Sequence, residues 1–323
     1  MSKQRVSPAQ TLIASLLRGA MRLGFAPQVL SLMSRSMNTP RLKRKAFASY
    51  TPNEHDVVVC TYAKSGTNWM LQIVTQIAYL GQGEFEHIHD LVPWPDPPMS
   101  GIVKPGEPTW EQAPTKLRAL KTHWEAPFVP YNPHARYIIV IRNPKDALVS
   151  GYYFADSIFS GVTQNVTPET WMRLFIKGRS IFGSWPEHTA SFWSWRERKN
   201  VLLLRFEDMK FDLKGTVRRV ASFMEVPLTG AQLEEITHKG SFGYMKKIDH
   251  KFAPPSLASG RDTAVMLRSG KSGSAKSFLN AAQRQEVDEA MKRELERLGS
   301  IFPYDQYYAR KGELKRAEPR RGR

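Results

Sequence analysis

A short polar turn, Lys64-Ser65-Gly66-Thr67, contains residue types suited to binding phosphate or sulfate. A β-branched run at Val57-Val58-Val59 precedes it and predicts a strand that is buried on both faces. An amphipathic segment follows it, with apolar residues at helical spacing at Trp69, Ile73, Ile77 and Leu80. The free N–H groups and positive end of a helix favour anions. The stretch Asp56 to Leu80 therefore predicts an anion site, in preference to an ordinary strand-to-helix connection with a solvated lysine.

This turn differs from a Walker A loop. That loop reads G-x-x-x-x-G-K-[ST], with the lysine and the Mg²⁺-binding hydroxyl after the second glycine. Here Lys64 precedes the only glycine, Gly66, and no Gly-Lys-[Ser/Thr] follows. The turn is therefore expected to bind a nucleotide's phosphates without the usual metal arrangement.

Polar residues also follow two further predicted strands. Residues 118–123 form a short strand that ends in Lys121-Thr122-His123, and Tyr137–Ile141 forms a buried strand that leads into Arg142-Asn143-Pro144-Lys145-Asp146. Ligands of open α/β sheets bind beyond the carboxyl ends of the strands, where these residues fall. No acid ends the second strand, so the Walker B metal ligand is missing and we expect no metal.

Predicted helices alternate with these strands. A further strand is predicted at 201–206, and helices at 147–154, 212–225, 229–239 and 281–298, with two aromatic-rich helices in 168–199. This alternation predicts an α/β protein, a three-layer α/β/α sandwich with a central, mostly parallel, P-loop-NTPase-like sheet. Residues 246–274 have no helical or strand period and are expected to form a lid or binding loop.

Positive charge is concentrated at the two ends of the chain. The net charge is +17; residues 1–50 hold nine Lys or Arg and no acid, and residues 310–323 hold seven Lys or Arg and two Glu. We expect a basic helical arm at 1–45, a single catalytic domain at 46–309 and a basic tail at 310–323. The arm, with two helices at 10–37 broken by Gly24–Pro27, either packs on the domain or lies on an anionic membrane surface.

The remaining composition is that of an ordinary globular protein of 323 residues, long enough for a sizeable core. The only cysteine, Cys60, lies within the first predicted strand, so a disulfide framework is excluded, which is compatible with a reducing compartment. No apolar run reaches the length of a membrane span, and the short run at 11–17 fits a signal peptide poorly. We therefore expect a cytoplasmic protein, with the arm as a candidate for peripheral membrane contact.

Together these residues resemble the cytosolic-type sulfotransferases that use 3′-phosphoadenosine 5′-phosphosulfate (PAPS). The family's T-Y-P-K-S-G-T-T-W is similar to Thr61–Trp69, and its R-N-P-K-D followed by V-S-Y-Y is similar to Arg142–Asp146 and Val149–Tyr153. Its K-T-H, Y-E-D-M, T-S-F-x-x-M and R-K-G-x-x-G-D-W-K motifs resemble residues 121–123, 206–209, 240–245 and 268–276. Six motifs in the right order, over about residues 55–300, make chance an unconvincing explanation.

The resemblance implies a role for each matching residue. The 5′-phosphosulfate would be held by Lys64, Ser65, Gly66, Thr67, Asn68 and Trp69, and the 3′-phosphate by Arg142, Ser150, Arg268 and Gly270. The adenine would lie beside Trp69, Phe206 and Phe242. His123 would be the general base, and Lys64 and Lys121 would neutralise charge on the transferring sulfuryl group. Taken alone, His123 would more readily be interpreted as a structural histidine at a strand end.

Several positions depart from the family pattern. Ala63 replaces a proline, Asn68 a hydroxyl residue, Phe206 a tyrosine, Gly240 a threonine and Ser269 a lysine, while Ser274-Ala275 replaces Asp-Trp. The family's dimer motif is degraded to Lys276…Asn280-Ala281…Gln285, so that mode of dimerisation is not supported. These changes indicate a divergent member, with weaker cofactor binding and lid packing as open points.

The expected function is transfer of a sulfuryl group from PAPS to a hydroxyl of a small or lipid-like acceptor. The Pro- and Trp-rich 91–98 and the aromatic 152–158 stretches favour apolar or aromatic alcohols, and sugars also remain open. One alternative, a P-loop-like nucleotide or small-molecule kinase, lacks its Gly-Lys-[Ser/Thr] and strand-end acid. Another, a non-catalytic basic protein that binds membrane or nucleic acid, leaves the Lys64, Lys121 and His123 set unexplained; no specific nucleic acid is expected.

Overall fold

Four parallel strands form the sheet of the described part of the chain. In this computed structural model the described residues are 15–17, 19–96, 102–159, 162–254, 265–268, 270 and 273–309. The strands are β1 (Asp56–Thr61), β2 (Arg118–Thr122), β3 (Arg136–Ile141) and β4 (Val201–Arg205), in the order β2-β1-β3-β4. The predicted strands and the parallel sheet are confirmed, except that Phe206 begins a helix instead of ending a strand.

Alternate residues of each strand point to opposite faces of the sheet. In β1, Val58 and Cys60 belong to one apolar core and Val57 and Val59 to the other. Val58 is paired with Leu120 of β2 and Tyr137 of β3, and both neighbours belong to the same core as Val58. Both faces of the sheet are therefore covered, which explains why the strands read as continuous apolar runs instead of alternating with polar residues.

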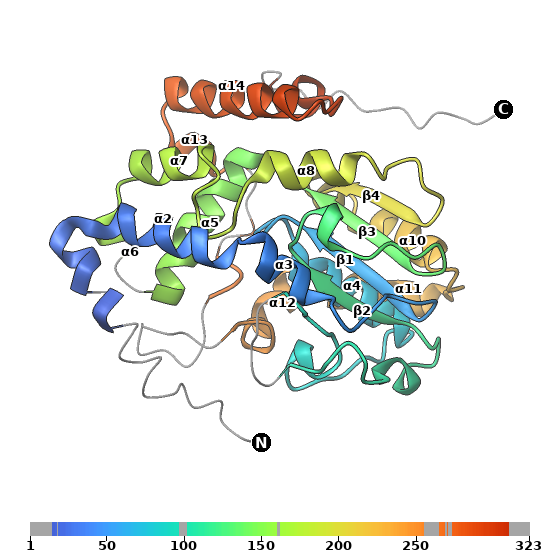
Figure 1. The fold of residues 1–323 in the computed structure, drawn as a ribbon. Coiled ribbons are helices and arrows are strands. Elements are labelled where there is room, and N and C mark those ends of the chain that lie inside the picture. The colour runs from blue at the N-terminus through green and yellow to red at the C-terminus, as the bar shows by residue number, and fades with distance from the viewer. Residues whose placement is uncertain are drawn as a thin grey trace.

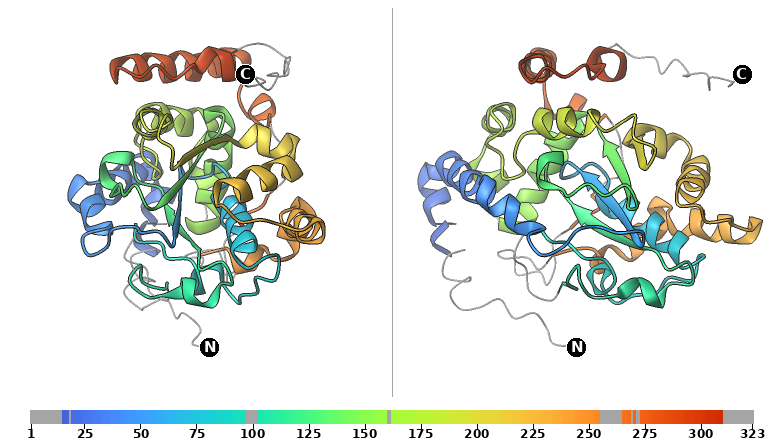
Figure 2. Two further views of the ribbon diagram at one scale, coloured as in Figure 1. Left: turned by 90° about the vertical axis from the view of Figure 1, so that its right-hand side faces the viewer. Right: turned by 45° about the vertical axis from the view of Figure 1, so that its right-hand side comes forward.

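Helices cover both faces and produce the predicted three layers (Figures 1 and 2). One core includes residues of α4 (Thr67–Ala78), α9 (Phe206–Phe211), α10 (Leu213–Phe223), α11 (Gly230–Lys239) and α12 (Phe242–Lys247). The other includes residues of α2 (Ala26–Met37), α5 (Pro144–Phe159), α6 (Val162–Asn165), α7 (Pro168–Ile176), α8 (Trp185–Trp193), α13 (Ala275–Phe278) and α14 (Ala281–Arg297). The aromatic residues of α7 and α8 mostly enter this second core.

The N-terminal arm packs on the domain through a buried ion pair. It comprises a one-turn helix, η1 (Met21–Phe25), with a kink at Gly24 (φ 92°), then α2 and α3 (Pro40–Ala46). Lys43 Nζ lies 2.6 Å from Glu125, two residues beyond His123, and both side chains are buried. Within the described ranges every helix is too short or too polar to span a bilayer. The first residues of the arm and the predicted tail at 310–323 lie outside these ranges.

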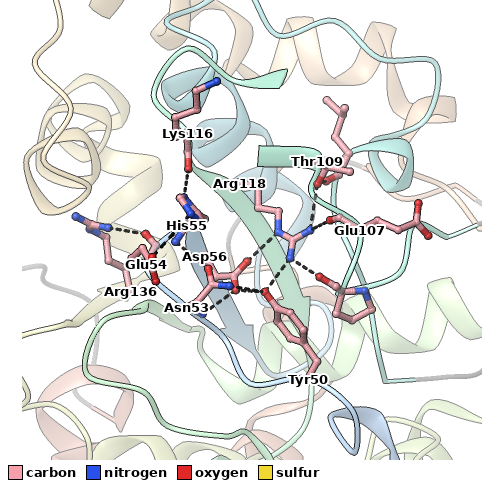
Figure 3. Close-up of polar contacts among 12 residues, drawn as sticks. Tyr50, Asn53, Glu54, His55, Asp56, Glu107, Thr109, Lys116, Arg118 and Arg136 are labelled. Carbon is pink, nitrogen blue, oxygen red and sulfur yellow. Dashed lines mark hydrogen bonds and ion pairs between the residues drawn. The ribbon is translucent and has the colours of Figure 1, made fainter. Parts of the chain in front are cut away.

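A second buried ion pair joins the amino ends of β1 and β2 (Figure 3). Arg118 Nε donates to Asp56 Oδ1 at 2.8 Å, and neither side chain is more than 3% exposed. The other guanidinium N–H groups donate to Glu107 O, Thr109 Oγ1, Tyr50 Oη and Pro105 O. Tyr50 Oη and the Asn53 amide donate to the second carboxylate oxygen. All five donors of the arginine therefore have partners, as burial of a charge requires.

Replacing Arg118 by methionine is expected to lower the free energy of unfolding by about 3–5 kcal/mol, because it leaves the carboxylate of Asp56 charged and buried. Urea unfolding followed by circular dichroism would measure the loss. Arg136→Met is the matched control: Arg136 begins β3 at the same end of the sheet, and its partner Glu225 is exposed. An exposed pair contributes about 0–1 kcal/mol, so equal losses in the two variants would contradict the expectation.

Candidate active site

The turn between β1 and α4 has an unusual backbone conformation. Lys64 has φ 66° and Gly66 has φ 93°, both in the left-handed region. A Cβ on Gly66 would lie 2.8 Å from the Phe206 ring, so glycine is required by space as well as by φ. Thr67 begins α4, and its Oγ1 lies 2.6 Å from Thr61 Oγ1, which ties the helix start to the end of β1.

Three buried polar atoms of the turn and its surroundings have no partner among the described residues: the acceptor Asn68 Oδ1 and two groups that can donate, Ser65 Oγ and Arg142 Nε. Arg142 follows β3, donates from Nη1 to Lys64 O at 2.7 Å, and places its guanidinium carbon 4.2 Å from the Phe206 ring centre. Buried polar groups are normally paired, so an orphaned hydroxyl and an orphaned guanidinium N–H indicate a ligand with acceptor oxygens. The residues present fit a phosphate or sulfate group.

Two lysines lie close enough for the charge of one to act on the other: Lys64 in the turn after β1 and Lys121 on β2. Lys64 Nζ lies 3.7 Å from the Phe154 ring centre, and Lys121 Nζ lies 3.5 Å from the Trp94 ring centre. Burial, with the charges of Arg142 and Lys121 added, lowers the pKa of Lys64 to about 7. Burial also lowers the pKa of Lys121 to about 7. Two ammonium groups packed on aromatic faces, with no ion pair on Lys64 from the residues that the structure describes, suit a site that receives its negative charge from a ligand.

His123 follows β2 and is held by the end of β1. Its Nδ1 lies 2.8 Å from Thr61 O. A carbonyl oxygen only accepts, so Nδ1 carries the proton and Nε2 carries the lone pair. Burial, followed by the charge of Lys121, holds the pKa of His123 well below 6.5. The imidazole is therefore neutral near pH 7 and able to accept a proton at Nε2.

Sequence reasoning missed Asp96, which anchors the segment that carries His123. Its carboxylate accepts from the His123 backbone N–H at 2.5 Å and from Thr122 Oγ1 at 2.7 Å. Burial raises its pKa to about 6, against the opposing effect of these hydrogen bonds. The available signal was an acid within the otherwise apolar, Pro-rich 91–98 segment, of which Pro97 and Pro98 lie outside the described residues.

The other predicted site residues lie around the same end of the sheet. Trp69 Nε1 donates to Gly240 O at 2.7 Å, and its ring meets Phe206 edge-on at 5.5 Å. Phe242 lies against Gly270, whose Cβ position is 2.5 Å from that ring. Asn68 begins the same helix turn as Trp69 and donates to Phe252 O at 3.4 Å, and Ser150 is part-buried on α5.

The lid region is tied to α5. Asp146 accepts from the Gly273 and Ala275 amides at 2.8 and 3.3 Å, so the carboxylate of the Arg142–Asp146 segment holds the lid's end although Ser274-Ala275 replaces Asp-Trp. Arg268 lies 4.4 Å from the Tyr153 ring centre. Burial lowers the pKa of Arg142, and the charge of Arg268 adds to this effect. Ser269, Lys271, Ser272 and residues 255–264 of the predicted lid lie outside the described residues.

These features define the class of protein. The polar turn after β1, Lys121 near the end of β2 with the neutral His123 just after it, and Arg142 after β3 meet at the carboxyl edge of a parallel sheet, where α/β enzymes bind ligands. Among the described residues no three His, Cys, Asp or Glu side chains are grouped to hold a metal ion. The geometry is that of a P-loop-like enzyme that transfers an anionic group.

Comparison with known proteins identifies the family. The model of the sulfotransferase domain matches residues 54–299. Sulfotransferase 1C2 of Oryctolagus cuniculus is 31% identical over 267 residues, which cover 79% of this chain and 88% of that protein. The chain belongs to the sulfotransferase family. Membership, predicted from the motifs, is confirmed, and the moderate identity agrees with a divergent member.

Solved structures share the fold. Mouse sulfotransferase SULT7A1 was crystallised with PAP (3′,5′-bisphosphoadenosine) and has a TM-score of 0.59 at 23% identity. The match covers 82% of this chain and 90% of the mouse chain. Retinol dehydratase, in complex with androsterone and the inactive cofactor PAP, has a TM-score of 0.65 at 18% identity and covers 81% and 87%. The predicted P-loop-like α/β fold is confirmed.

Proposed function

We propose that this sulfotransferase moves the sulfuryl group of PAPS to a hydroxyl of a small or lipid-like acceptor, with His123 as general base. The observation that carries the proposal is the bond between His123 Nδ1 and Thr61 O, 2.8 Å long. This hydrogen bond fixes the tautomer of His123 that can take a proton at Nε2. His123 lies in the same buried region as Lys64 and Lys121.

The donor end of the site fits an adenosine bisphosphate. Ser65 Oγ and the N–H groups at the start of α4 suit the 5′-phosphosulfate, together with Gly66, Thr67, Asn68 and the charge of Lys64. The orphaned Arg142 Nε suits the 3′-phosphate, since a guanidinium fork matches phosphate oxygens. Ser150, Arg268 and Gly270 complete that end of the site. Trp69, Phe206 and Phe242 would border the adenine. The two solved relatives were both crystallised with PAP, which supports this donor.

The residues of the chain divide the reaction between them. His123 Nε2 takes the proton from the acceptor hydroxyl as its oxygen forms a bond to sulfur. The bond from sulfur to the 5′-phosphate oxygen breaks, and that oxygen leaves with the electron pair. Protonated Lys64 and Lys121 stabilise charge on the sulfuryl and leaving oxygens. By analogy with phosphoryl transfer, positioning and electrostatics supply most of the rate enhancement.

Aromatic rings line the acceptor side and favour an apolar alcohol. Trp94 meets His123 edge-on at 5.6 Å, and Phe154 lies beside Lys64 and 6.1 Å from Phe182. Relatives act on or bind such molecules: androsterone occupies retinol dehydratase, and a guinea-pig relative is a 3-beta-hydroxysteroid sulfotransferase. Aromatic walls also bind sugars, so the acceptor is to be found by assay.

The decisive experiment is transfer of labelled sulfate from PAPS to a panel of phenols, sterols, lipids and sugars. We expect labelled product with at least one hydroxyl acceptor, and loss of it in Lys64→Ala. Full activity of Lys64→Ala would contradict the mechanism. Tight binding of ATP–Mg²⁺ without binding of 3′,5′-bisphosphoadenosine (PAP) would contradict the class of donor.

Binding of PAP is expected to be coupled to proton uptake above neutral pH. In the free protein the pKa of Lys64 and of Lys121 is about 7, so both amines are largely neutral at pH 8. A bound anion raises the pKa of each lysine, so binding draws in protons. Affinity should therefore fall as pH rises above 7, by up to about tenfold per pH unit for each lysine that must be charged.

Calorimetry in buffers of different ionisation enthalpy would count the protons taken up at pH 8. Lys64→Met is the matched variant and should reduce the uptake while leaving the contribution of Lys121. Binding at pH 8 that releases protons, or exchanges none, would contradict the proposed electrostatics.

A further inference from the structure

Exposed apolar side chains gather on the N-terminal arm. Leu23 is 77% exposed and Leu32 is 68% exposed. Leu16, Phe25 and Met37 are exposed as well, so five large exposed apolar residues fall within residues 16–37. Those elsewhere in the described residues are scattered singly, at Tyr131, Tyr153, Phe211, Phe242, Leu298 and Ile301. Single exposed apolar residues are ordinary, whereas a cluster marks an interaction surface.

These exposed residues are not the ones that pack the arm on the domain. One face of α2 is already buried on the domain through Ala26, Val29 and Leu30, and the helix packs against α7. Phe25 and Leu32 are two turns apart on the flank of the helix next to this buried face, and Leu23 belongs to η1 just before them. A surface helix of a globular protein normally buries its apolar residues against the domain. The exposed apolar flank of this arm is therefore a candidate surface for a partner.

The charges on the arm itself are all positive, and the exposed Glu169 of the neighbouring α7 is paired with Arg173. Arg22 and Arg35 are exposed in η1 and α2, and Arg41, Arg44 and Lys45 are exposed in α3. Residues 1–50 contain no Asp or Glu. Bulky aliphatic and aromatic side chains bordered by arginine match the boundary between anionic lipid headgroups and acyl chains. A nucleic-acid surface would match the charge and leave the leucines exposed.

We propose that the face formed by Leu23, Phe25 and Leu32, with Arg22 and Arg35 around it, docks this protein on an anionic membrane surface. The arm is linked to the acceptor side of the proposed site through packed helices. η1 packs on α6, which follows α5, and α5 carries Phe154 beside Lys64 (Figure 1). The buried pair of Lys43 with Glu125 holds the arm to the segment that follows His123.

Flotation of the full chain with lipid vesicles tests the proposal. We expect binding to phosphatidylcholine vesicles that contain about one-third phosphatidylglycerol, weak binding to phosphatidylcholine alone, and a decrease between about 0.1 and 1 M salt. The variant Leu23→Ser/Phe25→Ser/Leu32→Ser should lose about tenfold or more in vesicle affinity. Arg22→Gln/Arg35→Gln should bind more weakly and lose part of the salt dependence.

The matched control removes exposed apolar residues from elsewhere. Phe211 is 82% exposed and Ile301 is 72% exposed, so Phe211→Ser/Ile301→Ser should bind vesicles like the wild type. Equal loss in both variants, or no binding by the wild type, would overturn the proposal. The proposal would also fail if the wild type were a dimer and the triple variant a monomer, because the face would then bind a second copy of the chain. It would fail as well if duplex DNA bound the wild type and the triple variant equally while vesicles bound neither. We expect PAP affinity to be unchanged in every variant. A loss of vesicle binding with normal PAP affinity is then distinguishable from a failure of the donor site.

Discussion

Replacing His123 by asparagine is expected to lower kcat by about 10²- to 10⁴-fold, the usual contribution of a general base. An asparagine amide can still donate to Thr61 O in place of Nδ1, which lies 2.8 Å from that oxygen. The variant therefore keeps the local hydrogen bond and loses only the lone pair at Nε2. Steady-state rates at saturating PAPS, with an acceptor found in the panel, would measure the loss.

Two companion measurements show whether the loss belongs to the base. PAP affinity should be unchanged in His123→Asn, because His123 is not among the proposed donor contacts. Asp96→Asn should lower kcat by less: it keeps the imidazole but turns one acceptor oxygen into a donor that faces either the His123 N–H or the Thr122 hydroxyl. Retention of wild-type kcat in His123→Asn would remove this histidine from the mechanism.

Replacing Arg142 by methionine is expected to weaken PAP binding by about 10²- to 10⁴-fold, since two charge-assisted hydrogen bonds to phosphate contribute about 1.5–3 kcal/mol each. The side chain is 9% exposed and its Nε has no partner among the described residues, so the guanidinium is desolvated before ligand arrives. Calorimetric titration with PAP would give the change in Kd. Arg142→Lys should recover only part of the affinity, because an ammonium cannot form the fork.

Adenosine 5′-phosphosulfate, which lacks the 3′-phosphate, separates two explanations. If Arg142 binds the 3′-phosphate, wild type and Arg142→Met should bind this compound with similar affinity. If the arginine acts mainly through its 2.7 Å bond to Lys64 O, both compounds should lose affinity equally. The second outcome would assign Arg142 to support of the turn and would contradict its proposed contact.

The strand–turn–helix from Asp56 to Leu80 could be predicted because its signals are local. A β-branched run, a polar turn and apolar residues at helical spacing specify their own backbone. The motifs after β2 and β3 are also contiguous in the chain, so Lys121, His123 and Arg142 could be named. No local sequence pattern predicted the positive φ of Lys64, because only the folded turn imposes that angle.

Other features of the site were decided only by the tertiary structure, because they arise where strands that are far apart in the sequence pair in parallel. The register of β1 with β2 brings Thr61 O to His123 Nδ1 and so selects the tautomer of the base. Burial between the packed layers, which no local pattern reports, lowers the pKa of Lys64 and Lys121. Asp96 lies 27 residues before His123 and reaches it only when the Pro-rich segment folds back on β2.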